Sequence, residues 1–475
     1  SFSSLSMSAK DIVYVKSGSS GDGSSWSKAF GNIQQAVDAA AKKGADVWVS
    51  KGIYKSDSSA VVFLKPKVNL YGGFAGTETS VAVRDTAKNQ TVLDGNGKIR
   101  VIYQDNDFAD TSSVVVDGFV IQNGYAAYGG GAYLENNVTI NNCILRNNRA
   151  SKYGSAIYAL SATIKNTQIV GNSYSNSMNY TVYLSNCKMD SCVVKNNIAY
   201  NYVAILAREK SNVSNCVIEG NSSVYYNNGY RGSTFNKSTV SNCKFLNTNG
   251  GGSAVGLYDA SEMRNCMFEG NKNVGTYLVY AAGNSKVEDC QILSNASTSN
   301  LIYLEGGKAN RCVIKDNTTS DRMMTIYYAS SSISNSVICN NECTYSNEPI
   351  YSYYANIINC TVAHNESKHA NVIYMSNATM KNSIVVGNKL NGNYGNVLSL
   401  NGTNMIKNNM FEGTFVDGNM DGSMAYAAFT DAENGDYSLS ANSYCINAGE
   451  DVADSLDLLG KSRKQGGAVD MGAIE

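Results

Sequence analysis

Five ionisable residues share one feature of their sequence context: each follows shortly after a short apolar segment. They are Glu135, Arg208, Glu209, Asp259 and Glu305. Cleavage of a polysaccharide by elimination needs a basic residue that takes a proton, and cleavage by hydrolysis needs paired carboxylates. The five residues are therefore candidates for catalysis, and a solvated surface is the alternative interpretation.

Three aspartates in one short stretch could bind a cation. Asp105, Asp107 and Asp110 form the pattern DxDxxD, whose carboxylates suit Ca²⁺. An acidic turn between two elements is the alternative. No other cofactor is expected. The two histidines, His364 and His369, have no cysteine or serine partner nearby in sequence, which favours a surface role.

Tyrosines are abundant, and many stand among Asn and Ser in turn segments. Seven of these are candidates for carbohydrate binding: Tyr174, Tyr180, Tyr200, Tyr202, Tyr225, Tyr226 and Tyr230. Exposed ring faces can contact the C–H groups of a sugar, while neighbouring amides bind its hydroxyls. The alternative is that these rings only cover the flank of the fold.

A repeat positions all of these residues. Its unit reads apolar, Asx, Cys or another small residue, aliphatic and Asn, as in residues 213–221 and 263–271. The small-residue position recurs thirteen times between Gly118 and Asn409, about every 24 residues. Eleven of the thirteen units have Asn or Asp just before this position, and eleven have Asn five residues after it. Asn and Asp tolerate left-handed backbone, so the first column predicts a tight bend in every unit.

A second apolar segment follows about 15 residues later in each unit and often carries a tyrosine. The tyrosines of this column are Tyr133, Tyr158, Tyr183, Tyr280, Tyr303, Tyr327 and Tyr374. The segment predicts another strand of the same coil, in which we expect the rings to stack and serve packing. Eight of the twelve cysteines share the small-residue position, which predicts a column of buried free thiols.

These patterns predict an all-β fold. A period near 24 residues without a helical pattern excludes most helical repeats and favours a coil of short parallel strands. The crossover rule makes that coil right-handed. The sequence therefore predicts a single right-handed parallel β-helix, a solenoid of about 24-residue coils with an N-terminal helical cap.

The two ends of the sequence lack the repeat. Residues 32–44 predict an amphipathic helix that ends at Gly44 and covers the N-terminal opening, with strands at 46–49 and 68–71. We divide the chain into a cap with the first coils over 1–100, repeats over 101–425 and a capping segment over 426–475. The last segment is expected to close the other end.

Composition limits the partners. Among 475 residues the formal net charge is −1, which argues against nucleic acid. Nowhere do 18 apolar residues follow one another, so no transmembrane helix is expected. Ser1 to Lys10 resembles the start of a mature chain whose signal peptide was removed. We expect a monomer.

Motifs at both ends carry a resemblance to a known family. Residues 14–15, 21–26, 51–54 and 71–78 resemble the opening of bacterial secreted β-helix proteins of the pectate-lyase-like superfamily, abundant in Bacteroidetes. Residues 457–463 and 469–475 resemble the terminal motif of the choice-of-anchor Q proteins. The resemblance implies the fold and a secreted or surface-anchored location, but no reaction. Within the motifs, Glu78 and Arg84 are expected to pair.

Two hypotheses for function follow. The favoured one is a secreted or cell-surface protein, such as an adhesin, that binds a polysaccharide or surface glycan through a lateral face rich in Tyr and Asn. The alternative is a polysaccharide lyase or glycoside hydrolase acting on an acidic or complex polysaccharide through the ionisable residues named above.

Overall fold

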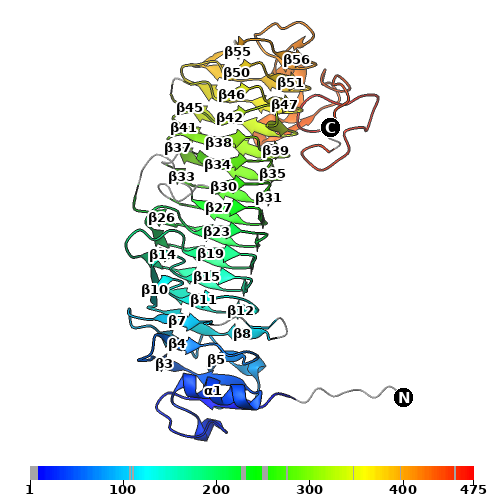
Figure 1. Ribbon diagram of the computed structural model, residues 1–475. Coiled ribbons are helices and arrows are strands. Elements are labelled where there is room, and N and C mark those ends of the chain that lie inside the picture. Colours follow the sequence, from blue (N-terminus) through cyan, green and yellow to red (C-terminus); the bar gives the residue numbers. More distant parts are fainter. Residues whose placement is uncertain are drawn as a thin grey trace, which may run out of the picture. The chain divides into compact units, whose positions relative to one another are not determined.

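The fold is a right-handed parallel β-helix, shown in Figure 1 as a computed structural model. The structure describes residues 9–105, 108–109, 112–225, 232–248, 255–273, 277–345, 347–395, 397–453 and 456–475. Contacts divide the chain into two compact units, Ser1–Val217 and Ile218–Glu475. In each unit, successive coils place their strands in three parallel sheets, here called A, B and C. The predicted fold is thereby confirmed.

The strands of the first unit are short and follow one another through the sheets. Sheet A holds β1 (Ile12–Val15), β2 (Asp46–Ser50), β5 (Leu70–Phe74), β8 (Val114–Asp117), β12 (Val138–Asn141), β16 (Thr163–Lys165), β20 (Lys188–Asp190) and β24 (Asn212–Ser214). Sheet B holds β3 (Gly52–Tyr54), β6 (Thr91–Asp94), β9 (Phe119–Gln122), β13 (Ile144–Arg146), β17 (Gln168–Val170) and β21 (Val193–Lys195), and β25 (Val217–Glu219) includes the boundary between the units. Sheet C holds β4 (Ala60–Phe63), β7 (Arg100–Tyr103), β11 (Ala132–Leu134), β15 (Ile157–Leu160), β19 (Val182–Ser185) and β23 (Ile205–Arg208). Between sheets B and C lie β10 (Tyr125–Tyr128), β14 (Arg149–Tyr153), β18 (Ser173–Tyr174) and β22 (Ile198–Ala199).

The second unit repeats this order. Its sheet A holds β28 (Thr239–Ser241), β31 (Glu262–Arg264), β35 (Lys286–Glu288), β39 (Lys308–Asn310), β43 (Ser332–Ser334), β47 (Asn356–Ile358), β51 (Thr379–Lys381) and β56 (Met405–Lys407). Its sheet B holds β29 (Lys244–Leu246), β32 (Met267–Glu269), β36 (Gln291–Leu293), β40 (Val313–Lys315), β44 (Val337–Cys339), β48 (Thr361–Ala363), β52 (Ile384–Val386), β57 (Met410–Phe411) and β58 (Met420–Asp421). Its sheet C holds β27 (Ser233–Asn236), β30 (Val255–Tyr258), β34 (Tyr277–Ala282), β38 (Asn300–Glu305), β42 (Met324–Tyr327), β46 (Ile350–Tyr353), β50 (Ile373–Ser376) and β55 (Leu398–Asn401). Shorter strands are β26 (Ser222–Ser223), β33 (Lys272–Asn273), β37 (Ala296–Ser297), β41 (Thr318–Thr319), β45 (Glu342–Cys343), β49 (Glu366–Ser367), β53 (Lys389–Leu390), β54 (Asn393–Tyr394), β59 (Phe429–Asp431) and β60 (Asp436–Leu439).

The bends between sheets A and B lie where the Asx column predicted them. Asn142, Asn166 and Asn215 have φ of 51°, 48° and 54°, in the left-handed region. Asparagine adopts this region at little cost because its short side chain can bond locally. Within the strands, side chains alternate between the interior and the surface, so β12 and β15 bury every second residue.

The second Asn column is buried and forms a ladder along the axis. In the first unit, the Oδ1 of Asn172 accepts the backbone N–H of Asn148 at 3.0 Å and its side-chain amide at 3.0 Å. The amide of Asn148 also donates to the carbonyl of Ile121 at 3.0 Å. Each asparagine therefore satisfies buried polar groups of neighbouring coils.

All twelve cysteines lie in described parts of the chain, all are buried, and none of them forms a disulfide. In the repeated column a thiol contacts a backbone carbonyl two residues before it, as Cys143 does with Asn141 at 3.2 Å. The predicted column of buried thiols is confirmed.

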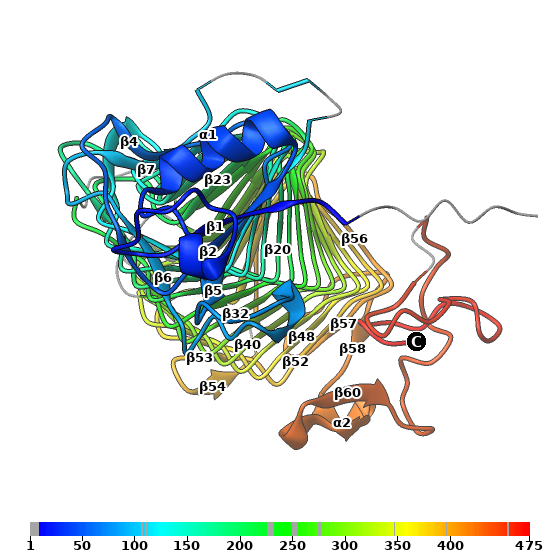
Figure 2. The ribbon, with the colours of Figure 1, turned by 90° about the horizontal axis from the view of Figure 1, so that it is seen from below.

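The N-terminal elements match their prediction. Helix α1 (Ile33–Lys43) begins at Asn32, whose side chain accepts the N–H of Gln35, and ends at Gly44 with φ of 66°. It packs against β1, β2 and β4 (Figure 2). Two single-turn helices, η1 (Trp26–Lys28) and η2 (Val81–Val83), flank this region.

The predicted pair of Glu78 with Arg84 is wrong. The carboxylate of Glu78 instead accepts the backbone N–H groups of residues 75–77. Arg84 pairs with Asp117 at 2.5 Å. Both residues still fix the first coils, because Asp117 belongs to β8 and Glu78 closes the turn after β5.

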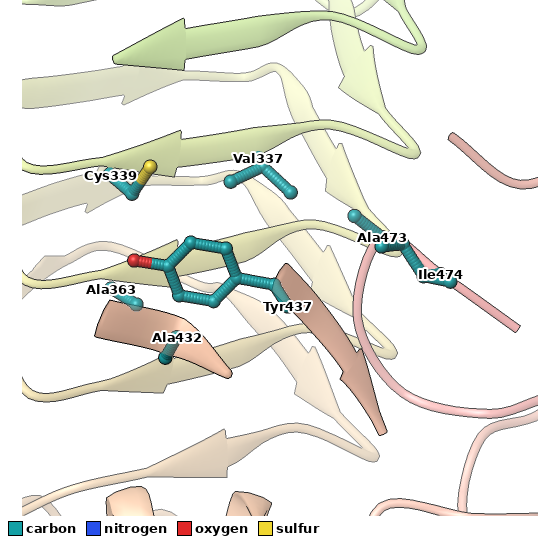
Figure 3. Packing of buried hydrophobic residues seen from close by; sticks show 7 residues of the cluster. All are labelled: Val337, Cys339, Ala363, Ala432, Tyr437, Ala473 and Ile474. Carbon is teal, nitrogen blue, oxygen red and sulfur yellow. The ribbon is translucent and has the colours of Figure 1, made fainter. Parts of the chain in front are cut away.

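The segment after β58 packs along the side of the second unit. It contains α2 (Met424–Ala427), η4 (Ala432–Asn434), β59 and β60, which lie outside the stacked strands (Figure 2). Tyr437, Ala473 and Ile474 pack on outward side chains of β44 and β48, among them Val337 and Ala363 (Figure 3). The segment thus covers an apolar side of sheet B, whereas we expected it to close the open end of the coil. Among the described residues, no helix is long and apolar enough to cross a membrane.

Candidate functional site

Four tyrosines form a stack on the outward face of sheet C in the first unit. Tyr103, Tyr133, Tyr158 and Tyr183 occupy one register position of neighbouring strands. Their ring centroids lie 5.5, 5.3 and 4.3 Å apart in chain order. All four rings are half-buried. Because the residues on either side of each tyrosine point into the core, the strand pleat places every ring on the surface.

Two further tyrosines widen this stack toward the strands between sheets B and C. Tyr128 ends β10 and meets Tyr158 edge-on at 5.3 Å. Tyr153 ends β14 and meets Tyr183 in the same way at 5.8 Å. We call these six residues the tyrosine stripe: Tyr103, Tyr128, Tyr133, Tyr153, Tyr158 and Tyr183. The guanidinium of Arg100 lies 4.3 Å from the centre of the Tyr103 ring, at one end of the stripe.

Two phenol groups of the stripe, those of Tyr133 and Tyr158, are held in their protonated form. Burial, and then the hydrogen bond to Glu135, raise the pKa of Tyr133 to about 12. Burial and the neighbouring Tyr183 hydroxyl also raise the pKa of Tyr158. At neutral pH these groups are therefore hydroxyl donors as well as ring surfaces.

The second unit has shorter tyrosine stacks on its own sheet C. Tyr258, Tyr280 and Tyr303 lie 5.3 and 5.7 Å apart, and Tyr351 stacks on Tyr374 at 4.9 Å. Thr325, not Tyr327, stands opposite Tyr303, which corrects the predicted column. Tyr327 lies two residues further along, opposite Glu305, and stacks on Tyr353 at 4.8 Å.

The catalytic candidates of the first unit border the tyrosine stripe, but Glu135 lies apart from Arg208 and Glu209. Glu135 accepts the hydroxyl of Tyr133 at 2.8 Å. Arg208 contacts Glu209 at 3.5 Å, and both side chains are nearly half exposed. Glu135 and Arg208 are separated by three strand spacings, about 14 Å. This separation is too large for the two groups to act on one proton transfer.

The other two catalytic candidates belong to the second unit. Glu305 accepts the hydroxyl of Tyr280. Asp259 accepts the side-chain amide of Asn236 at 2.7 Å and has a left-handed backbone, with φ of 52°. Asp259 directly follows Tyr258, which occupies the same register position as Glu305 two strands away. The backbones of Tyr258 and Glu305 are therefore about 10 Å apart. A catalytic role for any of the five residues stays a prediction.

The predicted calcium ligands fall in a region that is described only in part. Asp105 follows β7, whereas Asp107 and Asp110 lie outside the described residues. In the described ranges, no three or more His, Cys, Asp or Glu side chains are grouped so that they could hold a metal ion.

The predicted carbohydrate-binding tyrosines are differently exposed. Tyr180 is only 5% exposed and stacks on Tyr202 at 5.3 Å, which corrects the expectation that its ring lies on the surface. Tyr174 and Tyr200 lie 6.1 Å apart at an angle of 53°. Tyr225, in the second unit, is 42% exposed. Tyr226 and Tyr230 lie outside the described residues.

The sequence did contain a signal for the tyrosine stripe. We expected the Tyr133, Tyr158 and Tyr183 column to serve packing, yet each of these residues stands between two small or aliphatic ones. Such alternation in a short strand places the flanking residues in the core and the tyrosine on the surface. Tyr128 and Tyr153 carry no such signal, because irregular segments follow them.

None of the curated proteins compared with the chain matches it. Among solved structures, pectate lyase Pel9A is 13% identical over 99% of this chain and 97% of its own, with a TM-score of 0.33. The tailspike protein of E. coli bacteriophage HK620 is 13% identical over 78% of this chain and 76% of its own, with a TM-score of 0.35. The PL6 family alginate lyase AlyGC is 11% identical over 87% of this chain and 53% of its own, with a TM-score of 0.35.

These likenesses are too weak to carry a site or a reaction to this chain. The family model described as "Right handed beta helix region" matches residues 136–292 and, in a second overlapping match, residues 184–342. These residues supply strands to all three sheets. The match and the observed strand order together identify the fold as a right-handed parallel β-helix.

Proposed function

We propose that this protein binds glycans at a bacterial cell surface or outside the cell, through the tyrosine stripe of the first unit. The observation that carries the proposal is the in-register stack of four half-exposed rings on sheet C, at 4.3–5.5 Å from centre to centre. The strand pleat and the ring contacts hold these side chains in place before any ligand arrives, so little conformational entropy is lost on binding.

The chemistry of the tyrosine stripe suits a sugar chain. The exposed edges of the stacked rings offer apolar contacts to the C–H groups of pyranoses, and the phenol hydroxyls can exchange hydrogen bonds with sugar hydroxyls. Arg100 lies at one end of the stripe, where it contacts the Tyr103 ring. Arg208 lies at the other end, with its guanidinium 3.5 Å from the Tyr183 hydroxyl. A row of aromatic edges and hydroxyl groups with a cation at each end offers both apolar and polar contacts to a sugar chain.

Catalysis has less support than binding. Glu135 and Arg208 are about 14 Å apart along sheet C, so they cannot share a substrate bond. Tyr133, which contacts Glu135, has a pKa of about 12 and is a poor general base at neutral pH.

The proposed location rests on the motifs at residues 71–78 and 457–475, which resemble those of secreted and surface-anchored β-helix proteins. Fractionation of the native host, with an antibody against the protein, tests it. Protein found only in the cytoplasm would contradict the proposal.

The binding experiment compares stripe variants on a panel of neutral and acidic polysaccharides by affinity electrophoresis. Tyr158→Ala and Tyr183→Ala should each weaken binding about tenfold, or ~1.4 kcal/mol, because each removes one ring and one hydroxyl from the stripe. Tyr158→Phe should retain most of the affinity, since the ring stays. Tyr394→Ala is the matched control, because Tyr394 is 62% exposed but lies outside the stripe.

Equal affinity of wild type and the double variant Tyr158→Ala/Tyr183→Ala would contradict binding at the stripe. The same incubations are assayed for new reducing ends and for the ultraviolet absorbance of unsaturated uronates. Product formation that is lost in Glu135→Gln or Glu305→Gln would instead favour the enzyme hypothesis.

A further inference from the structure

A groove of about 670 Å³ lies in the second unit, between the outward face of sheet A and the C-terminal segment. Its floor comes from β35, β39, β43 and β47, which contribute Lys286, Lys308 and Ser332 among others. Val452 and Ala453 form the opposite wall. This groove is on a different sheet from the tyrosine stripe and shares no residue with it.

The wall of the groove is anchored to the coils by Glu450, two residues before Val452. The Glu450 carboxylate contacts the ammonium groups of Lys381 at 2.8 Å and Lys407 at 2.7 Å. The side chain of Asn382 also exchanges two hydrogen bonds with the Glu450 backbone, at 2.8 and 3.0 Å. The groove is therefore formed before a ligand enters it.

Two lysines with little compensation lie side by side on the floor. Lys286 and Lys308 are directly opposite each other in neighbouring strands. Lys286 reaches one carboxylate, that of Glu262, at 3.5 Å. The ammonium group of Lys308 makes no ion pair or hydrogen bond with the described residues. Like charges at directly opposite positions destabilise a sheet, so an anion placed between them relieves a cost.

The other charged groups at the floor already have partners. Arg311 pairs with Asp289 at 2.8 Å, and Glu288 pairs with Arg264 at 2.9 Å. Among the described residues at the floor, the cations Lys286, Lys308, Arg264 and Arg311 outnumber the anions Glu262, Glu288 and Asp289 by one. Beside the wall, Asp451 pairs with Lys464 at 3.1 Å.

Several polar groups of the groove can donate hydrogen bonds, whereas the Glu288 carboxylate and the Oδ1 of Asn356 are acceptors in its lining. The Oδ1 of Asn310 accepts from Ser334 at 3.1 Å and from Asn335 at 2.9 Å, so its amide N–H groups remain for a ligand. Among the described residues, the hydroxyls of Ser330 and Ser332 have no partner and can also donate. A site with a spare cation and several donors fits a ligand that supplies negatively charged acceptors.

We propose that this groove binds the oxyanion groups of an anionic oligosaccharide, with Lys308 and Lys286 contacting a carboxylate or sulfate. Ser330, Ser332 and Asn310 donate to the remaining oxygens. The volume exceeds that of a single small anion, and Val452, Ala453 and Ala329 offer apolar contacts to a sugar ring.

The test is calorimetric titration of the full chain with three probes of similar length. They are a carboxylated oligosaccharide (oligogalacturonate), a sulfated one (dextran sulfate oligomers) and a neutral one (dextran oligomers). We expect binding of at least one charged probe, weaker at higher salt, and none of the neutral probe. Binding of only the carboxylated or only the sulfated probe supports the proposal and identifies the oxyanion.

Substitutions of lining residues test whether the charged probes bind in the groove. Lys308→Gln should weaken binding about tenfold, and Lys286→Gln less, because Glu262 already compensates Lys286 in part. Lys188→Gln is the matched control, since Lys188 occupies the same outward position of a sheet A strand but does not line the groove. Ser332→Ala tests the floor without changing charge and should weaken binding a few-fold.

Three outcomes would overturn the proposal: no binding of either charged probe, equal weakening by Lys188→Gln, or unchanged affinity of the double variant Lys286→Gln/Lys308→Gln. Binding that is lost in Tyr158→Ala but kept in the lysine variants would place the anionic sugar on the tyrosine stripe instead. The lysines are on the surface, so circular dichroism should show all variants folded.

Discussion

Asparagine side chains of the buried ladder form several hydrogen bonds with neighbouring coils. In the second unit the Oδ1 of Asn317 accepts the backbone N–H of Asn295 at 2.9 Å and its amide at 3.0 Å. The amide of Asn317 donates to the carbonyl of Ile292 at 2.8 Å and to Asn341 at 2.9 Å. Asn317 is 1% exposed, so water cannot replace any of these bonds.

Asn317→Ala should therefore lower the free energy of unfolding by about 3 kcal/mol, because it leaves buried donors and acceptors of neighbouring coils unpaired. Urea denaturation followed by circular dichroism measures the change. Asn317→Thr should cost less, since Thr248 occupies this position naturally, and its hydroxyl bonds the carbonyl of Leu246. A midpoint for Asn317→Ala within error of wild type would show that the ladder does not stabilise the coil.

Among the elements, the C-terminal segment depends most on contacts distant in sequence. Arg463 is 1% exposed, and its guanidinium donates to Asn335 at 2.9 and 2.6 Å and to the carbonyl of Ala473 at 3.0 Å. It also lies 3.7 Å from the carboxylate of Glu475. The terminal motif thus fixes the segment to a bend between sheets A and B.

His364 reports on the docking of this segment. Its Nδ1 lies 3.2 Å from the hydroxyl of Tyr437, and burial lowers its pKa below the usual 6.5. The neutral ring is therefore favoured in the folded protein. The stability from neutral His364 is fully present above pH 6.5 and is lost as pH falls through the lowered pKa of the folded state.

His364→Asn should reduce the fall in melting temperature between pH 7.5 and 5.5 relative to wild type. Asparagine suits the left-handed backbone at this position, where φ is 57°. Scanning calorimetry at several pH values measures the difference between the two proteins, which removes the contribution of other titrating groups. Parallel pH profiles for both would show that His364 does not titrate with folding.

The coils could be predicted from sequence because each repeats the same local rules. Asn142 and the equivalent residues of other coils predict where the chain turns. The alternation of residue types in segments such as Ala132–Leu134 predicts which side chains are buried. The position of the C-terminal segment could not be predicted this way. It depends on the outward residues Val337 and Ala363, which read like ordinary strand residues until a distant segment covers them. The groove beside Lys308 was missed for the same reason.

For the whole molecule, the repeated cysteine column means that thiols supply core volume in both units. Burial raises the pKa of Cys143, Cys312 and Cys360 to about 12, and that of Cys187 and Cys339 to about 11. A thiol reacts through its thiolate, so these side chains are inert in the folded protein. They act as small apolar residues: Cys143, Cys312 and Cys360 fit the narrow bend between sheets A and B, whereas Cys187 precedes β20 and Cys339 ends β44 under the C-terminal segment.

The native protein should therefore show no rapid reaction with a thiol reagent such as Ellman's reagent near pH 8. After denaturation without reductant it should show all twelve thiols. Reductant should not change the melting temperature, because no disulfide limits the unfolded chain. Ten or fewer thiols after denaturation would show that at least one disulfide forms. Rapid native labelling would show that coils open locally, and mass spectrometry of the labelled peptides would identify which of them open.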